Sequence, residues 1–155
     1  MSTTLQALLE QSENERDAAL ARVQQADEAL RQGQAQAEQL HAYREDYRRR
    51  APALNGKGAS IELVRCHQGF MQRLDQAIEH QKAQVVAIEK HAAVLRDQLL
   101  ERELRVASVK KLLERRADEA MRREARADQR RTDEHAQRAT WGRTDVFASY
   151  SHTQH

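Results

Sequence analysis

The amino-acid sequence predicts an all-α fold in which two long helices form an antiparallel coiled-coil hairpin. Aromatic residues make up only 4% of the 155 residues and charged residues 32%, a composition that cannot fill a thick core. Apolar residues instead return at seven-residue intervals, the pattern of helices packed along a narrow seam. Helix-breaking residues gather in one short segment, which divides this pattern into two helices.

The first helix is predicted over residues 4–50, where small and apolar residues repeat in a heptad pattern. The seam is rich in small residues but continuous, so it favours a left-handed coiled coil. Its a positions carry Leu9, Arg16, Val23, Leu30, Ala37 and Arg44, and its d positions carry Leu5, Ser12, Ala19, Ala26, Gly33, Leu40 and Tyr47.

A loop is predicted over residues 51–59, because the only proline of the chain, Pro52, lies there with Gly56 and Gly58. A short connection makes two long helices antiparallel neighbours. Ser60 is placed to cap the next helix at its N-terminus. Residues 1–140 are therefore expected to form one coiled-coil domain.

The second helix is predicted over residues 61–140, and Trp141-Gly142 is expected to end it. Residues 141–155 lack periodicity and are expected to form a disordered tail. The a positions are Met71, Ile78, Val85, Ala92, Leu99, Val106, Leu113 and Ala120, and the d positions are Leu74, Gln81, Ile88, Leu95, Arg102, Val109 and Arg116. At about 1.5 Å per residue the first helix covers the second only as far as about Ala107, and the rest overhangs.

Aromatic residues flank the predicted turn at g and d positions of both helices. The two stripes have the same spacing and should form one apolar-aromatic strip, half in the core and half exposed. Either the aromatic residues thicken the core, or they form a docking surface, which their g positions favour. The strip consists of Gln36, Leu40, Tyr43, Tyr47, Phe70, Leu74, Ala77 and Gln81. With a turn centred near Asn55, Leu40 should lie level with Phe70.

The overhanging stretch from about Leu112 to Arg126 is rich in arginine. Sequence physics favours a solvated helix with local ion pairs, such as Glu119 with Arg123, over a binding surface. Interleaved acidic residues would repel phosphates, so no nucleic acid is expected as a partner.

No catalytic site, cofactor or metal is expected, because no phosphate-binding loop, metal-ligand set or nucleophile–base pair with a pocket can be assembled. Cys66 is the only cysteine and has no partner for a disulfide, which favours a reducing compartment. No apolar run approaches the roughly 20 residues of a membrane span, and the N-terminus does not look like a secretory signal. A cytoplasmic protein without membrane insertion is expected.

Five segments, in this order and spacing, resemble the flagellar export protein FliJ family, especially its beta-proteobacterial members. They are Leu40–Tyr47, Phe70–Ile78, Lys111–Arg116, Arg122–Arg126 and Asp133–Ala136. The resemblance covers about residues 5–140. It implies a coiled coil like the central stalk (gamma) of rotary ATPases, in a cytoplasmic component of the type III export apparatus at the inner membrane.

The resemblance further implies three kinds of partner: the export ATPase FliI, the export-gate protein FlhA and export chaperones. The FlhA contact would fall on the strip near the hairpin turn. The FliI contact would lie at the opposite end, which overturns the preference for a solvated helix there. Its expected residues are Leu112, Leu113, Arg115, Arg116, Glu119, Arg122 and Arg123.

Two alternatives have the same architecture. A stalk protein of a virulence-type secretion system would differ in its genome neighbours. A homodimeric coiled-coil scaffold would have twice the mass in solution and no ATPase partner.

Overall fold

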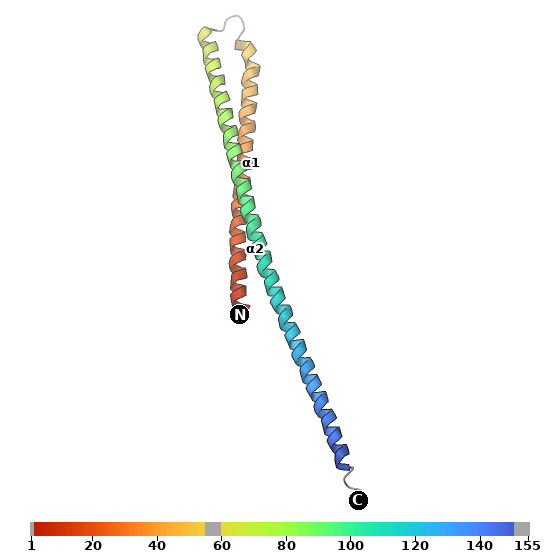
Figure 1. Ribbon diagram of the computed structural model, residues 1–155. Helices are drawn as coiled ribbons and strands as arrows, with labels where there is room; N and C mark the ends of the chain where they lie inside the picture. Colours follow the sequence, from red (N-terminus) through yellow and green to blue (C-terminus); the bar gives the residue numbers. More distant parts are fainter. Residues whose placement is uncertain (1, 55–59, 151–155) are drawn as a thin grey trace. The chain divides into compact units, whose positions relative to one another are not determined.

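The computed structural model describes residues 2–54 and 60–150, and all of these residues except Ser60 are helical. Helix α1 spans Ser2–Leu54 and helix α2 spans Ile61–Tyr150 (Figure 1). The expected all-α hairpin of two long helices is confirmed. The chain divides into two compact units, Ala7–Val106 and Met1–Gln6 with Ala107–His155.

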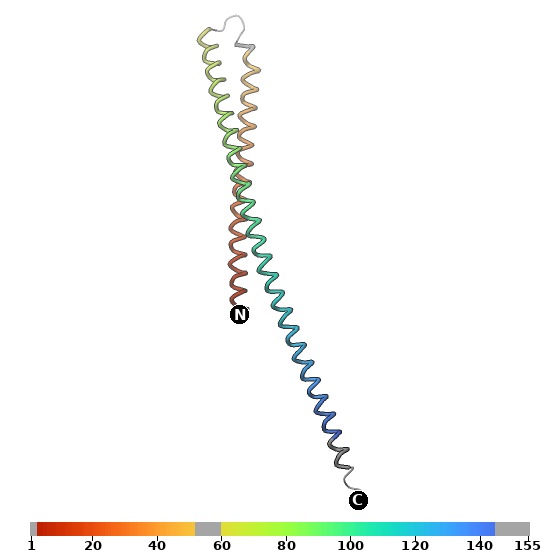
Figure 2. The backbone as a smooth tube through the Cα atoms, viewed as in Figure 1, coloured from red at the N-terminus to blue at the C-terminus, as the bar shows by residue number. Residues whose placement is uncertain are grey.

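Within Ala7–Val106 the two helices run antiparallel and pack along their length (Figure 2). Ion pairs join them: Arg96 to Asp27 at 2.7 Å and Arg102 to Glu15 at 2.6 Å. Asp27 and Arg96 are both e positions, and e positions face each other in an antiparallel coiled coil. These ion pairs join earlier residues of α1 to later residues of α2, as an antiparallel arrangement requires.

The seam of this unit follows the predicted heptad. Every a and d position that was expected between residues 9 and 106 is buried or half-buried. The tightest positions are small side chains, Ala92 at 1% exposure and Ser12 at 2%. The buried hydroxyl of Ser12 donates a hydrogen bond to the carbonyl oxygen of Leu8 at 2.8 Å. The core is therefore one side-chain layer thick and depends on close helix approach.

The start of α2 is capped as the sequence predicts. Ser60 Oγ accepts a hydrogen bond from the backbone N–H of Leu63 at 3.2 Å, and the Ser60 carbonyl oxygen accepts from Val64 at 3.2 Å. Glu62 lies in the first turn, where the helix dipole favours a negative charge.

Both helices run further than predicted. Helix α1 continues past Pro52 to Leu54, although it was expected to end at Arg50. A proline near the end of a helix removes one hydrogen bond but need not stop the last turn. Of the predicted loop, residues 55–59 lie outside the described residues.

Helix α2 continues past Gly142 to Tyr150, whereas it was expected to end at Thr140. A glycine inside a helix costs only about 1 kcal/mol, which its neighbours can offset. The hydroxyls of Thr140 and Thr144 donate to carbonyl oxygens one turn back, at 2.8 and 2.9 Å. Of the expected tail, residues 151–155 lie outside the described residues.

In the second unit, burial ends a short way along α2. Leu5 and Val109 are buried, with 9% and 7% exposure, and Leu113 is half-buried. Coverage thus extends slightly beyond the predicted limit at Ala107. From residue 114 to residue 144 every side chain is exposed except half-buried Ala127. We call this stretch, residues 114–144, the overhang.

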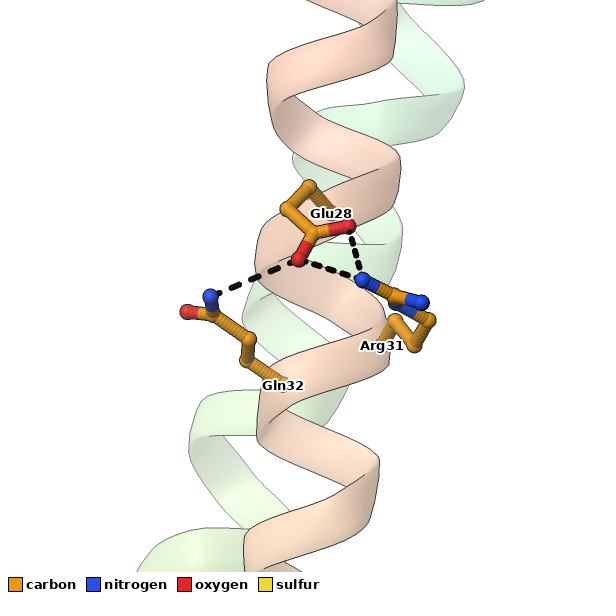
Figure 3. A network of polar contacts seen from close by, with 3 residues as sticks. All are labelled: Glu28, Arg31 and Gln32. Atoms are coloured by element: carbon orange, nitrogen blue, oxygen red, sulfur yellow. Dashed lines mark hydrogen bonds and ion pairs between the residues drawn. The ribbon is translucent and has the colours of Figure 1, made fainter.

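The water-facing side of α1 carries a local polar network (Figure 3). One nitrogen of Arg31 donates to both carboxylate oxygens of Glu28 at 2.7 Å, and Gln32 donates to Glu28 at 3.4 Å. The hydrogen bond from Arg31 lowers the pKa of the Glu28 carboxyl below its ordinary value. Such exposed pairs stabilise a helix only weakly, and all three residues of this network belong to α1.

Candidate functional site

The predicted strip is formed by two facing stripes near the hairpin end. At one end, Gln81 Nε2 donates to Gln36 Oε1 at 3.3 Å, and at the other the rings of Tyr47 and Phe70 stack with centroids 4.4 Å apart. The helical spacing places the remaining members, Leu40 with Ala77 and Tyr43 with Leu74, between these two contacts. The eight residues of the strip therefore lie together on one side of the hairpin.

The facing partners differ from those expected. Phe70 packs on Tyr47, seven residues beyond Leu40, which was expected level with it. The pairing differs from the expected one because α1 continues to Leu54 and does not end at Arg50. A shift of one heptad leaves each residue on the same face, so the strip keeps its members while their pairing changes.

Tyr47 lies at the centre of a cluster of rings at the hairpin end of the strip. Tyr43 stacks on it with centroids 6.2 Å apart, and His67 lies on it at 6.0 Å. His67 Nε2 is 3.3 Å from the Tyr47 carbonyl oxygen, which can only accept, so this nitrogen carries the hydrogen. The Arg50 guanidinium lies 5.9 Å from the Tyr47 ring centre, within reach of a cation–π contact.

Exposure divides the strip into a contact face and a support. Tyr43 is 61% exposed, and the other g positions, Gln36, Phe70 and Ala77, are exposed or half-buried. The d positions lie deeper: Leu40 and Tyr47 are half-buried, and Leu74 and Gln81 are buried. The expected arrangement, half in the core and half exposed, is what the structure has. Leu74 and Gln81 hold the strip from below and present little surface to a partner.

Gln81 is a buried polar residue that forms hydrogen bonds with the facing helix. Its Nε2 donates to the carbonyl oxygen of Gly33 at 3.1 Å in addition to Gln36. A β-carbon at Gly33 would lie 3.4 Å from Val85 and 3.6 Å from Ile88. The missing side chain at position 33 therefore lets the helices approach closely and leaves its carbonyl within reach of Gln81.

A groove of about 590 Å³ opens beside the strip. Six residues line it, and four of them belong to the strip: Gln36, Leu40, Tyr43, Gln81, with Gln39 and Ala42 beside them. A groove with an exposed tyrosine at its edge can accept an apolar side chain of a protein partner.

The residues expected to bind the ATPase lie on one stretch of α2. Leu112 is 39% exposed and Leu113 is half-buried, so they mark the end of the covered seam. Beyond them, Arg115, Arg116, Glu119, Arg122 and Arg123 are all exposed. The structure brings these seven residues onto a single helix surrounded by water.

Sequence reasoning missed several residues at these sites. Arg50 and His67 contact the central tyrosine, and their roles depend on the register of the hairpin, which heptad spacing does not give. Trp141 was taken as part of a helix end, but it is helical, 74% exposed and lines a depression of about 390 Å³.

Within the described ranges, 2–54 and 60–150, no three His, Cys, Asp or Glu side chains gather into a possible metal site. Nor is any helix of those ranges long and apolar enough to cross a membrane.

Comparison with known proteins identifies a family. The family described as flagellar FliJ protein matches residues 1–145. No curated protein and no solved structure matches the chain. The match covers all of α1 and nearly all of α2. The chain therefore belongs to the flagellar FliJ family, whose members are components of flagellar type III protein export.

Proposed function

We propose that this FliJ-family protein is a stalk-like adaptor that links the export ATPase FliI to the export gate FlhA. The observation that carries the proposal is the difference between two surfaces. The hairpin end presents an apolar-aromatic strip, and the overhang presents an exposed, arginine-rich helix without a facing helix among the described residues. Two surfaces of different chemistry suit two different partners.

The strip supports the gate contact. An exposed tyrosine on a rigid aromatic support is typical of residues that dominate binding energy, because little side-chain entropy is lost on docking. Tyr43 is held by stacking on Tyr47, which in turn packs on Phe70. FlhA would bind the Tyr43 ring, and an apolar side chain of FlhA would enter the adjacent groove.

The overhang supports the ATPase contact. Its arginine residues are exposed and can form two-pronged hydrogen bonds with carboxylates of another protein. ATP hydrolysis in FliI would then be coupled to the gate through the helices between the two surfaces. The protein itself contributes no catalytic group to this function.

The proposal includes two further points that rest on family membership. The protein escorts export chaperones, and it associates peripherally with the inner membrane through the export apparatus. Membership of the flagellar family also favours flagellar export over a virulence-type system.

The gate contact is tested by capture of purified FlhA with Tyr43→Ala. Loss of an exposed anchor ring should weaken binding by about tenfold or more. Leu100→Ala is the matched control, because Leu100 is also exposed, at 54%, and lies outside the strip. Equal binding by both variants would refute the gate assignment.

The ATPase contact is tested by reversing the four arginines at positions 115, 116, 122 and 123 to glutamate. Stimulation of FliI should be lost, while the helical circular-dichroism signal persists because all four side chains are exposed. The control reverses four exposed arginines of the hairpin, namely Arg22, Arg31, Arg65 and Arg73. Unchanged stimulation in the first variant would rule out this contact.

A further inference from the structure

As far as residue 130, the overhang continues the heptad of the hairpin seam. The next two positions after Leu113 at intervals of seven are Ala120 and Ala127, before Glu134. The next three d positions after Val109 are all arginine, namely Arg116, Arg123 and Arg130, before Gln137. Because α2 is one helix from Ile61 to Tyr150, these residues form one stripe on it. Between residues 114 and 130 the stripe has small residues at a and a cation at each d.

The hairpin shows what an arginine at this position binds. Arg102 is also a d residue, and its guanidinium lies 2.6 Å from the Glu15 carboxylate of the facing helix. A guanidinium nitrogen of Arg105 also lies 3.9 Å from the Glu15 carboxylate. An arginine on the seam thus extends over the facing helix and is neutralised by a carboxylate there. Arg116, Arg123 and Arg130 repeat this position in the overhang, where all three side chains are exposed.

Three of the five acidic residues between residues 113 and 130 lie on the other side of the helix. Glu114 and Asp128 are b positions and Asp118 is an f position, so all three lie away from the a/d stripe. The other two, Glu119 at g and Glu124 at e, border the stripe, where they are outnumbered by the three d arginines and Arg126 at g. The stripe is more basic than the nearly balanced composition of the segment suggests.

A second copy of this chain fits the stripe poorly. Two copies would bring two sets of seam arginines to one interface. Between residues 113 and 130 each copy offers only one carboxylate, Glu119, at the g position that Glu15 has on α1, because the other g residue there is Arg126. Alanine at the a positions buries little apolar area, so charge has to contribute much of the attraction. The best complement is a helix that carries negative charge where Glu15 stands on α1.

We propose that the stripe of residues 113–130 binds an acidic helix of a partner, with carboxylates at about seven-residue intervals, in the place that α1 takes in the hairpin. Small a residues allow the two backbones to approach closely, and each seam arginine crosses to a carboxylate of the partner. The identity of the partner as FliI rests on the proposed function, and the chemistry of its helix does not.

The first test measures binding of a labelled helical peptide to the full chain by fluorescence anisotropy. The peptide has an alanine–leucine seam with glutamate at every seventh position, and its control has glutamine in place of each glutamate. The glutamate peptide should bind about tenfold more tightly or better, since charged pairs replace neutral ones. Equal binding of the two peptides would overturn the proposal.

A pair of double variants separates the face from the charge. Arg116→Glu with Arg123→Glu changes two d positions, whereas Arg115→Glu with Arg122→Glu changes two neighbouring c positions by the same charge. The d pair should weaken binding of the glutamate peptide about tenfold or more, and the c pair less than about threefold, because exposed charges at a distance are screened. Equal losses would overturn the proposal.

Stimulation of FliI by the same variants distinguishes this inference from the proposed function. If the d pair loses stimulation of FliI and the c pair keeps it, the result supports both the ATPase contact and the acidic-helix proposal. Equal loss with the d and c pairs leaves the ATPase contact standing and overturns the acidic-helix proposal. If all four reversals leave stimulation intact while the peptide results hold, the ATPase contact is wrong and the acidic-helix site stands. A dimeric mass in light scattering that the d pair converts to a monomer would overturn the proposal in favour of a second copy.

Discussion

The hairpin of Ala7–Val106 and the overhang of residues 114–144 use similar residues with different results. In the hairpin, arginines beside the facing helix can reach across to it, as in the 2.7 Å pair of Arg96 with Asp27. In the overhang, Arg131 pairs with Asp128 of its own helix at 3.6 Å, and both side chains are more than 70% exposed. The heptad is continuous between these regions, so the facing helix makes the difference. A heptad pattern specifies a face for packing and does not specify what packs there.

The largest effect should come from placing a charge at equivalent a positions of the two regions. Ala92→Glu puts a carboxylate where the native side chain is 1% exposed, and the hairpin should lose about 2–4 kcal/mol of unfolding free energy. Ala120→Glu, at an exposed a position, should cost less than about 0.5 kcal/mol. Urea titration followed by circular dichroism measures both. Similar losses would mean that the overhang is packed in solution.

A second comparison concerns two helical glycines. Gly33→Leu should cost the hairpin about 1–3 kcal/mol, because a β-carbon there already lies 3.4 Å from Val85 and further atoms have no room. A β-carbon at Gly142 would meet no atom within 4 Å, so Gly142→Leu should raise the helical content through the better helix propensity of leucine. Thermal unfolding curves of the two variants test this. A stabilised Gly33→Leu variant would show that the helices can separate at no cost.

A smaller effect should follow from removing carboxylates that pair in different ways. Glu15→Gln breaks the contact with Arg102 and should cost about 0.5–1 kcal/mol, as expected for a partly exposed ion pair across helices. Glu119→Gln, in the overhang, should leave the unfolding free energy unchanged within about 0.3 kcal/mol. A double-mutant cycle with Arg102→Ala isolates the first pair. A coupling of zero would contradict the geometry of that pair.

The smallest effect should be the pH dependence of the surface network on α1. The pKa of Glu28 is lowered in the folded chain by its hydrogen bond from Arg31. A carboxyl with a lowered folded pKa stabilises the fold above its unfolded value, near 4.5, and loses this contribution as the pH falls through the folded pKa. The difference in helicity between the native chain and Glu28→Gln should therefore vanish on acidification. A difference that persists at low pH would contradict the assignment.

The sequence predicts the inward-facing residues of the hairpin well, because heptad periodicity is a local property. From Leu9 to Arg44 in α1 and from Met71 to Val106 in α2, the expected seam is the observed one. Past Leu113 the pattern continues with Ala120 and Arg116, yet both are exposed. Local spacing contains no information on where the facing helix ends.

The pairing across the hairpin could not be predicted, since it depends on the turn. Local rules end α1 before Pro52, but the helix continues to Leu54, and the pairing moves by one heptad. The faces survive such a shift, which explains why the strip has its expected members but different partners. The bonds of Gln81 to Gly33 and of His67 to Tyr47 follow from that pairing and were therefore missed.

Hydrogen exchange of the full chain, alone and with each partner, tests most directly whether the two surfaces bind different proteins. In the free chain, amides of residues 114–144 should exchange faster than those of the hairpin seam, because no packed helix protects them. FlhA should slow exchange in residues 36–47 and 70–81, and FliI in residues 113–130. Protection of the same segment by both partners would contradict the proposal that the protein links them through separate surfaces.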